Sequence, residues 1–424
     1  MRVLHLSWEY PPLVYGGLGR HVEALARAQA AAGFDVTVVT QTEGPPVRET
    51  VEGVRVIRVQ RDLPSLPFDE ANLLAWVAGL ELALTRAVVE MAKDWQPDVV
   101  HAHDWVVAHT AVTSRALLNV PVVATFHATE AGRHQGWLPS PLSRAIYSVE
   151  WWLAHESTSL ITCSEHMRWE TDRLFGVGVD KVSVIPNGID RRVWSTTPQA
   201  VERMRARYGG SGPLLISTAR LEWEKGIHTL LDAMVDLRKS VPGIRLVIAG
   251  RGGKEADLRE QAQRLRLGRA ATFLGWLPEP DLHAIVAAAD VAIVPSIYEP
   301  FGLVALEAAA LGTPVIVADT GGLAEFAEAG RVAVTFKPGD ASSLAAAVRD
   351  LLADPESAQL REQAADEALS AKYSWDLIAQ LAKETYESAK AREPESAGRV
   401  TAAPPPAPSG NLLRSPQDPG SSKD

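Results

Sequence analysis

The chain has 424 residues, of which 46% are hydrophobic, and a formal net charge of −10 at pH 7. A chain of this length usually divides into more than one domain, and its apolar content suffices for two cores. The acidic balance, with no basic stripe along the sequence, argues against a nucleic-acid partner.

The sequence carries a single cysteine, Cys163, so an intrachain disulfide is excluded. This fits a reducing compartment, and we expect a cytoplasmic protein. The chain does not open with a charged region followed by an apolar one, so we expect no secretory leader. Its apolar runs stay short of the ~20 residues that span a bilayer, so we expect no transmembrane segment. Whether the protein is a monomer or a homo-oligomer stays open.

The first elements form a βαβ unit with a glycine-rich turn. Arg2–Ser7 is predicted to be a strand, the Pro-rich stretch 8–15 a loop, and Phe34–Thr40 a second strand. Between them, Gly16-Gly17-Leu18-Gly19 opens a helix that runs to Ala32. The glycines allow either a tight turn that packs helix against strand, or close approach of a ligand phosphate to the helix N-terminus.

The strand that begins at Asp98 ends in a polar cluster, after a strand at Val54–Val59 and a helix at Ala71–Met91. The cluster contains His101, His103, Asp104 and, further on, His109. A His-x-His pair with an aspartate can bind a metal. Other ligands are lacking in the sequence nearby, so we expect no metal here and interpret His101 as buried structure.

The next strand, from Val122, ends at His127. The carboxyl ends of strands in open α/β sheets are where ligands bind, so His127 is a site candidate rather than only a structural residue. Glu130, Arg133 and His134 follow in a polar loop. They either contact an acceptor molecule or only solvate a surface, and the sequence does not decide between the two.

Trp151 and Trp152 lie in a predicted helix and are expected in the core. A strand follows at Leu160–Cys163, and the turn signal Pro186-Asn187-Gly188 closes the first half. The strand–helix alternation then restarts, which predicts a second parallel sheet. Its strands are expected at Leu214–Ser217, Arg245–Ala249, Thr272–Leu274, Val291–Pro295, Pro314–Val317 and Val332–Thr335. Helices are expected at Ala341–Ala353, Glu356–Ala371 and Tyr373–Ala391.

The stretch from Ser296 to Glu307 joins a buried strand to an Ala/Leu-rich helix. Glu299 falls in the turn, and Gly302 and Leu303 fall at the helix's first turn, whose unpaired N–H groups suit a phosphate. Glu299 and Glu307 are eight positions apart, about two helical turns. We expect one acid at the mouth of the site and the other further down the helix, so that the two hold different parts of an elongated ligand.

Two cations, Arg220 and Lys225, follow the strand at Leu214–Ser217. Two cations in a loop at a strand end can neutralise a diphosphate without a metal. A second glycine pair, Gly321-Gly322, follows the strand after Glu307 and is placed to approach the same diphosphate.

Together these motifs resemble the retaining glycosyltransferases of family 4, the glycogen-synthase type with the GT-B fold. The hallmark of that family is Glu, seven residues, Glu, with an Arg and a Lys upstream, which here are Glu299, Glu307, Arg220 and Lys225. The resemblance covers nearly all of residues 1–390. One departure is Val14, where many bacterial starch and glycogen synthases have a lysine before the Gly-Gly pair. The sequence fits better the actinobacterial α-1,4-glucosyltransferase subgroup, which has a similar Trp-Glu-Tyr-Pro-Pro opening.

The resemblance implies two Rossmann-like α/β domains whose parallel sheets face a central cleft. The N-terminal acceptor domain would span 1–195, completed by the C-terminal helix 373–391, and the donor domain 196–372. The Pro/Ser/Gly-rich tail, 392–424, is predicted to be disordered.

The resemblance also implies roles for single residues. His127, with Arg220, Lys225 and Glu299, would serve catalysis. Donor-binding residues would be Gly16, Gly17, Gly302, Leu303, Glu307, Gly321 and Gly322, and residues facing the acceptor in the cleft would be Asp104, Trp105, Glu130 and Arg133.

The implied reaction is transfer of glucose from ADP- or UDP-glucose to an α-1,4-glucan with retention of configuration, with neither metal nor cofactor. Front-face attack is preferred to a covalent Glu299 intermediate, because no second acid is evident across the bond. The alternatives are a maltose-1-phosphate synthase, another family 4 hexosyltransferase such as a mannosyltransferase, a glycan phosphorylase, and a non-catalytic glycan-binding module.

Overall fold

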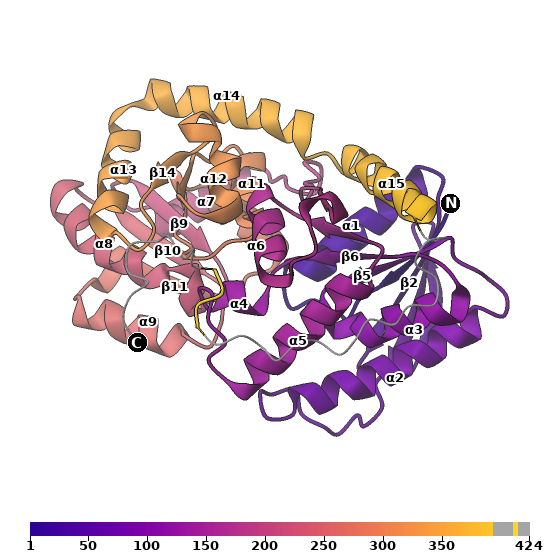
Figure 1. The fold of residues 1–424 in the computed structure, drawn as a ribbon. Coiled ribbons are helices and arrows are strands. Elements are labelled where there is room, and N and C mark those ends of the chain that lie inside the picture. Colours follow the sequence, from indigo (N-terminus) through magenta and orange to yellow (C-terminus); the bar gives the residue numbers. More distant parts are fainter. Residues whose placement is uncertain (393–409, 414–424) are drawn as a thin grey trace. The chain divides into compact units, whose positions relative to one another are not determined.

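The computed structural model describes residues 1–392 and 410–413. The chain forms two compact units, each with its own sheet (Figure 1). Unit 1 comprises Met1–Gly188 and the described residues from Trp375 onward, and unit 2 comprises Ile189–Ser374. The boundaries predicted at 195 and 372 lie near these two junctions. The predicted disorder of 392–424 falls outside the described residues, apart from Arg392 and 410–413.

Unit 1 contains an eight-stranded sheet in the order β3-β4-β2-β1-β5-β6-β7-β8. The strands are β1 Arg2–Leu6, β2 Asp35–Thr42, β3 Val47–Val51, β4 Val54–Gln60, β5 Val99–His103, β6 Val122–Phe126, β7 Ser159–Thr162 and β8 Val182–Val184. Its α-helices are α1 Gly17–Ala31, α2 Leu73–Met91, α3 Ala108–Leu118, α4 Glu130–Arg133, α5 Pro141–Glu156, α6 Glu165–Phe175 and α15 Trp375–Arg392. Every neighbouring pair is parallel except the hairpin of β3 and β4.

Unit 2 contains a six-stranded, all-parallel sheet in the order β11-β10-β9-β12-β13-β14. The strands are β9 Leu214–Thr218, β10 Arg245–Ala249, β11 Ala271–Gly275, β12 Val291–Val294, β13 Val315–Ala318 and β14 Val334–Phe336. The α-helices are α7 Pro198–Tyr208, α8 Ile227–Ser240, α9 Glu255–Arg264, α10 Glu279–Ala287, α11 Leu303–Ala310, α12 Gly321–Ala327, α13 Ala341–Ala353 and α14 Pro355–Lys372.

Both sheets reverse their strand order at one place. In unit 1 this switch point lies between β1 and β5, and in unit 2 it lies between β9 and β12. At such a point the connections leave toward opposite faces of the sheet, which opens a crevice at the carboxyl ends of the strands where ligands bind. The site residues are therefore expected at the carboxyl ends of these four strands.

The core of unit 1 includes α15, although that helix is the last in the chain. Its residues Ile378, Ala382 and Tyr386 are almost fully buried and pack with Val3 and Val123 of the sheet. The same helix lies against α1 (Figure 1). A segment nearly 200 residues downstream of β8 therefore completes the first unit.

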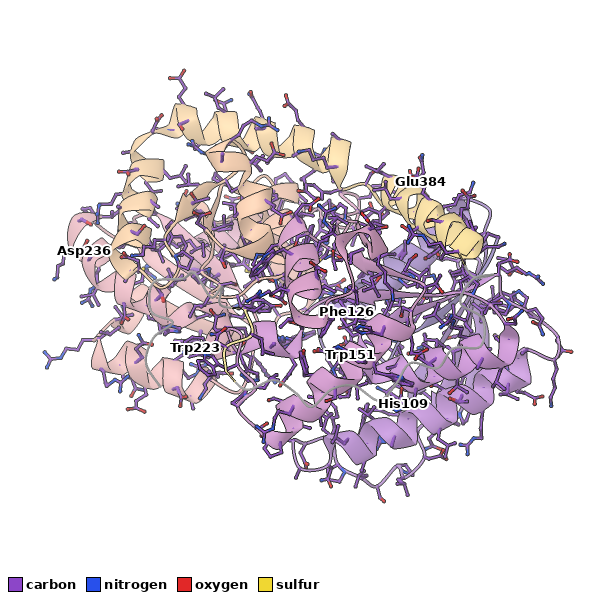
Figure 2. All side chains as sticks on the ribbon, viewed as in Figure 1. His109, Phe126, Trp151, Trp223, Asp236 and Glu384 are labelled. Atoms are coloured by element: carbon purple, nitrogen blue, oxygen red, sulfur yellow. The ribbon has the colours of Figure 1, made fainter. Side chains whose placement is uncertain are left out.

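One expectation about the fold is wrong, and one strand was not predicted. Trp151 and Trp152 on α5 are only partly buried, because the buried face of α5 is formed by Ile146, Tyr147, Glu150, Leu153 and Ala154. Trp151, labelled in Figure 2, instead stacks on the ring of His155. The sequence pattern also gave no sign of strand β3, whose residues are mostly exposed and polar.

Among residues 1–392 and 410–413, no helix combines the length and the apolar character needed to cross a bilayer.

Candidate active site

In unit 2 a glycine brings the loop after β9 against the end of β12. Gly226 has φ +65°, and a Cβ atom at this position would lie 1.8 Å from the carbonyl oxygen of Pro295. Only glycine allows so close an approach of the two backbones. Lys225 precedes this glycine, and its Nζ lies 2.9 Å from Oε2 of Glu299. The two predicted residues, 74 positions apart, thus meet at the switch point.

The Glu299 carboxylate is held from two sides. Besides Lys225, the hydroxyl of Ser296 donates a hydrogen bond to Oε2 at 3.0 Å. The side chains of Lys225 and Glu299 are only 17% and 15% exposed, so the pair is shielded from most of the screening that weakens surface ion pairs. The lysine charge is therefore partly compensated by the protein itself.

Arg220 also has a carboxylate partner, which the sequence patterns did not single out. Its guanidinium lies 3.4 Å from Oε1 of Glu224, and its side chain is 47% exposed. The carbonyl oxygen of Glu224 accepts the N–H of Ile297, which ties the β9 loop to the β12 loop. Trp223, labelled in Figure 2, is the half-exposed neighbour of this acid. Arg220, Lys225, Glu224 and Glu299 together carry no formal net charge.

The predicted glycines after β12 and β13 pack against one another. Gly302 has φ +105° and is the N-cap of α11, and a Cβ atom there would lie 2.4 Å from Leu323. The Gly322 N–H donates to the backbone carbonyl of Glu299 at 3.0 Å. The Gly322 N–H thus holds the backbone of Glu299 in place, so this N–H is not available to bind a phosphate. Gly321, with φ +51°, forms the first residue of α12.

Glu299 and Glu307 occupy the two positions expected for them. Because α11 begins at Leu303, Glu299 lies in the preceding loop and Glu307 lies further down, on the helix. Glu307 lines a small pocket together with Thr218 and Trp194. The indole of Trp194 was not predicted there, since no spacing connects it to the other residues.

In unit 1 the glycine loop after β1 already binds a carboxylate. Oε2 of Glu9 accepts the N–H groups of Tyr15 at 2.8 Å and Gly16 at 2.9 Å. Glu9 is 4% exposed, and this burial raises the pKa of its carboxyl group. The N–H of Gly16, predicted to face a phosphate, is thus paired with an internal acid. Gly17 is the first residue of α1, where helix N–H groups lack partners within the helix.

Asp104 and His127 meet at the ends of β5 and β6. Oδ1 of Asp104 accepts the backbone N–H of His127 at 2.7 Å. Asp104 has φ +61° and ψ 177°, a sparsely populated conformation for a residue with a side chain, and such strain concentrates at functional sites. Burial raises the pKa of Asp104 to about 7, against the opposing effects of the His127 N–H and the Arg133 charge. Trp105, partly buried, begins the short 3-10 helix Trp105–Val107.

Glu130 and Arg133 belong to the short helix α4. The Glu130 N–H donates to Oε1 of the buried Glu150 at 2.9 Å, and Oε1 of Glu130 lies 3.2 Å from Nε2 of His134. Arg133 is exposed, and its charge lowers the pKa of Asp104. Both residues therefore lie at the strand ends of unit 1, and Arg133 acts electrostatically on Asp104.

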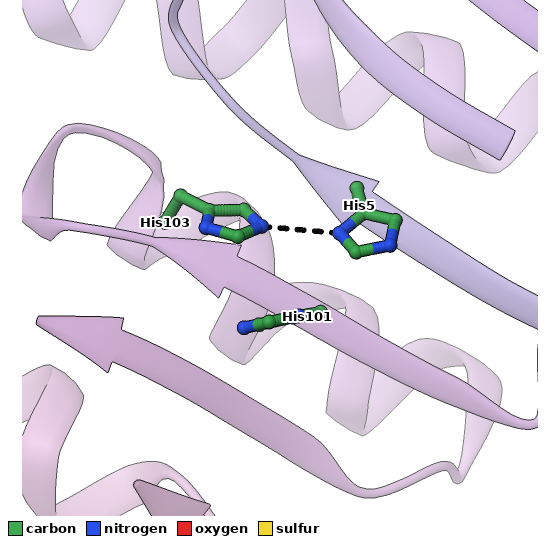
Figure 3. A group of neighbouring side chains, drawn as sticks. All are labelled: His5, His101 and His103. Carbon is green, nitrogen blue, oxygen red and sulfur yellow. Dashed lines mark hydrogen bonds between the residues drawn. The ribbon is translucent and has the colours of Figure 1, made fainter. Parts of the chain in front are cut away.

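The four residues considered for a metal do not converge on one point. The ring of the exposed His109 lies 2.8 Å from Glu81, and Asp104 bonds to the His127 backbone. His101 and His103 are buried and instead form a group with His5 (Figure 3).

Four aromatic rings gather beside the glycine loop, and the sequence did not predict them as a group. They are Trp8, Tyr15, Phe68 and Trp76. The rings of Trp8 and Tyr15 stack with their centroids 5.2 Å apart, while Tyr15 and Phe68 remain 44% and 48% exposed. An exposed apolar patch with polar neighbours is typical of a ligand-binding surface.

Comparison with known proteins gives the family. The family models "Glycosyltransferase Family 4" and "Glycosyl transferases group 1" match residues 15–193 and 202–368. The chain is 45% identical to the glycogen synthase of Mycobacterium tuberculosis, over 94% of this chain and 98% of that protein. The chain belongs to glycosyltransferase family 4.

Two further relatives of this family 4 chain are informative. It is 30% identical to the alpha-maltose-1-phosphate synthase of Mycolicibacterium smegmatis, over 92% of this chain and all of that protein. The sucrose-phosphate synthase structure from Thermosynechococcus elongatus matches it with a TM-score of 0.78 and 25% identity, over 92% of this chain and 99% of that one. The two parallel-sheet α/β domains of this family 4 protein are those of the GT-B fold, as the motifs implied.

The close contact at Gly226 gives a stability prediction. Gly226→Ala places a Cβ atom against Pro295 in addition to forcing alanine into a left-handed conformation. We expect it to lower the unfolding free energy of unit 2 by more than about 2 kcal/mol, as measured by urea denaturation. Gly339→Ala is the control, because Gly339 also has positive φ but a Cβ there meets open space. Equal losses for both variants would show that the contact with Pro295 does not matter.

The buried histidines predict how stability depends on pH. Burial lowers the pKa of His5 to about 4 and of His127 to about 3, whereas an unfolded histidine titrates near 6.5. Between these values the unfolded chain binds protons that the folded chain does not, so the unfolding free energy falls as the pH is lowered from 7 to 5. His21, His101 and His103 add to this fall in the same direction.

The buried acids act in the opposite direction over this range. They are Glu9, Asp104 and Glu150, whose raised pKa values let the folded chain keep protons. We expect the five histidines to outweigh the three acids in denaturation measured at pH 7 and pH 5. A free energy of unfolding that is higher at pH 5 than at pH 7 would contradict the neutral, buried state of the histidines.

Proposed function

We propose that this family 4 glycosyltransferase moves glucose from a nucleoside diphosphate glucose to an α-1,4-glucan with retention of the α configuration. The observation that carries the proposal is the Lys225–Glu299 pair at the unit 2 switch point, with Arg220 and Glu307 in the same unit. The 45% identity to a glycogen synthase supports glucose as the sugar and glucan as the acceptor. ADP and UDP remain equal candidates for the nucleotide.

In the proposed reaction, negative charge develops on the departing diphosphate. Arg220 and Lys225 stabilise that charge, together with the first N–H groups of α11 at Leu303. Glu299 turns from Lys225 toward the hydroxyls of the donor sugar, since a carboxylate accepts two such hydrogen bonds. Glu307, lining its pocket with Thr218, accepts the ribose hydroxyls.

We further propose that the acceptor hydroxyl attacks from the face the diphosphate leaves, and that the phosphate takes its proton. A covalent intermediate needs a free carboxylate with a second acid ~5–5.5 Å away. Glu299 is held by Lys225 and Ser296, which suits hydrogen bonding to a sugar better than nucleophilic attack. The cations supply the charge that a metal supplies elsewhere, so the reaction is proposed to need neither metal nor cofactor.

Unit 1 is proposed to bind the acceptor. Asp104, Trp105, Glu130 and Arg133 lie at the ends of its strands, and His127 is proposed to contact the transferred sugar there. The exposed rings of Tyr15 and Phe68 offer faces for the pyranose rings of a glucan. Since the chain has a single cysteine, which is buried, we keep a cytoplasmic location as part of the proposal.

A second candidate function is a maltose-1-phosphate synthase, which the 30% identity to such an enzyme favours. The two functions differ in the acceptor, which is glucan in one and glucose 1-phosphate in the other.

The decisive experiment incubates the protein with ADP-, UDP- and GDP-sugars and with either maltooligosaccharides or glucose 1-phosphate. We expect longer maltooligosaccharides, joined by α-1,4 linkages, with or without EDTA. Maltose 1-phosphate as product would establish the second candidate. Phosphorolysis of glucan, or the absence of any transfer from all donors, would refute the proposal.

Lys225→Ala tests the role of the charge in unit 2. We expect kcat to fall roughly 10²- to 10³-fold, because the variant removes a preorganised positive charge from the leaving diphosphate. Steady-state kinetics of glucosyl transfer measure this. Lys239→Ala is the matched control, since Lys239 is exposed in the last turn of α8. Unchanged kcat in Lys225→Ala would remove the main support for the mechanism.

Tyr15→Ala with Phe68→Ala tests the aromatic surface of unit 1. We expect the double variant to raise KM for maltooligosaccharides about tenfold and to leave KM for the donor within twofold, because apolar contact with the glucan is lost. Leu117→Ala on α3, which removes another exposed apolar side chain, should change neither constant. A rise in KM for the donor alone would indicate that the aromatic surface contacts the donor and not the glucan.

A further inference from the structure

A buried chain of seven hydrogen-bonded side chains runs through unit 1, and the proposed function uses only its last member, His127. In order, its members are Thr125, His101, Tyr386, Gln29, His5, His103 and His127. The first six are at most 2% exposed. They come from strands β1, β5 and β6 and helices α1 and α15, so the chain crosses the switch point between β1 and β5.

The links have ordinary hydrogen-bond lengths. On one side of Gln29, its Oε1 lies 2.8 Å from Nε2 of His5, whose Nδ1 lies 3.0 Å from Nε2 of His103 (Figure 3). Nδ1 of His103 then lies 3.2 Å from Nε2 of His127. On the other side, the Gln29 Nε2 lies 2.9 Å from the hydroxyl of Tyr386.

The Tyr386 hydroxyl continues this second arm of the chain. It lies 2.8 Å from Nδ1 of His101, and Nε2 of His101 lies 2.7 Å from the Thr125 hydroxyl. Both ring nitrogens of His5, His101 and His103 therefore have a partner within the protein. A metal ion held by these three rings would have to break the bonds that satisfy them, so we interpret the group as a hydrogen-bonded network.

Each histidine in the chain is neutral, because burial lowers the pKa of all four rings. A neutral imidazole carries one donor and one acceptor nitrogen. A ring that accepts a hydrogen bond at one nitrogen therefore donates at the other. Fixing the protonated nitrogen of one ring therefore fixes that of the next. As a result, all hydrogen bonds in the chain of side chains run from donor to acceptor in the same direction.

Gln29 sets that direction, because its amide presents an oxygen to one arm and an NH₂ group to the other. The oxygen faces His5, so Nε2 of His5 carries the proton and its Nδ1 accepts from Nε2–H of His103. His103 in turn accepts from Nε2–H of His127, which leaves Nδ1 of His127 as an acceptor. Turning the amide over would reverse every bond and give His127 a donor at Nδ1.

The second arm is consistent with the same amide orientation. The NH₂ group of Gln29 donates to the Tyr386 oxygen, whose O–H donates to Nδ1 of His101. Nε2–H of His101 then donates to Thr125. No two donors and no two acceptors face each other anywhere in the chain, and all four rings carry their proton on Nε2.

We propose that Gln29 is a positioning residue that fixes the proton of His127 on Nε2, so that Nδ1 presents an acceptor to a hydroxyl of the transferred sugar. The inference rests on the proposed function for the sugar contact, but the control of the proton by Gln29 stands independently of it. Gln29 acts through His5 and His103 and touches no substrate.

The experiment measures the ring ¹⁵N chemical shifts of the histidines in the full chain by NMR, since these shifts identify the protonated nitrogen. In the unmodified protein we expect His5, His101, His103 and His127 all to carry the proton on Nε2. Protonation of His127 on Nδ1 would overturn the proposal without any variant.

Gln29→Met removes both amide contacts while keeping a side chain of similar length. We expect a mixture of the two His127 tautomers and a fall in kcat of about five- to tenfold, which corresponds to a weakened hydrogen bond to substrate. Gln29→Glu keeps an oxygen toward His5 and should restore the Nε2 proton. Thr125→Val is the matched control: it cuts one bond at the opposite end of the buried chain and should leave the His127 tautomer unchanged.

A His127 tautomer that stays on Nε2 in Gln29→Met, or that changes equally in Thr125→Val, would overturn the role of Gln29. Failure of the proposed function would look different. The tautomers would then follow Gln29 as expected while no glucosyl transfer is detected with any donor.

Discussion

The close approach of two loops at Gly226 is the constraint on which the site in unit 2 depends. It lets a cation that follows β9 and an acid that follows β12 meet in a largely buried ion pair. Such a pair costs desolvation of both charges, and removal of one partner leaves the other poorly compensated. A negatively charged ligand could therefore take the place of Glu299 beside Lys225. This is the exchange proposed for the diphosphate of the sugar donor.

In both units, carboxylates pair with the backbone donors and cations that are proposed to bind the phosphates of the donor. Glu9 accepts N–H groups of the glycine loop in unit 1, and Glu224 and Glu299 pair with the two cations of unit 2. These acids hold the loops in a defined conformation, so the donors are preorganised and need little rearrangement at the moment of reaction. The same arrangement means that a ligand must displace, or share a cation with, an internal carboxylate.

The strands and most helices could be predicted because buried parallel strands are apolar along their whole length and their helices carry one apolar face. The family 4 motif could also be recognised in the sequence, because its residues recur at short, fixed spacings. What could not be predicted depends on contacts between distant positions. Glu9 is a single acid in a loop, Glu224 lies in a short 3-10 helix, and Gln29 meets Tyr386 across 357 positions, so no local spacing links these residues to their partners. The exposed β3 lacks an apolar face, and Trp151 lies off the buried face of its helix.

Glu299 and a diphosphate are proposed to compete for Lys225. Calorimetric titration with the free nucleoside diphosphate, which lacks the sugar, measures this competition. We expect Glu299→Gln to bind the diphosphate severalfold more tightly than the unmodified protein, because the lysine charge is released, and Lys225→Ala to bind it more weakly. Equal or weaker binding by Glu299→Gln would contradict the proposed competition.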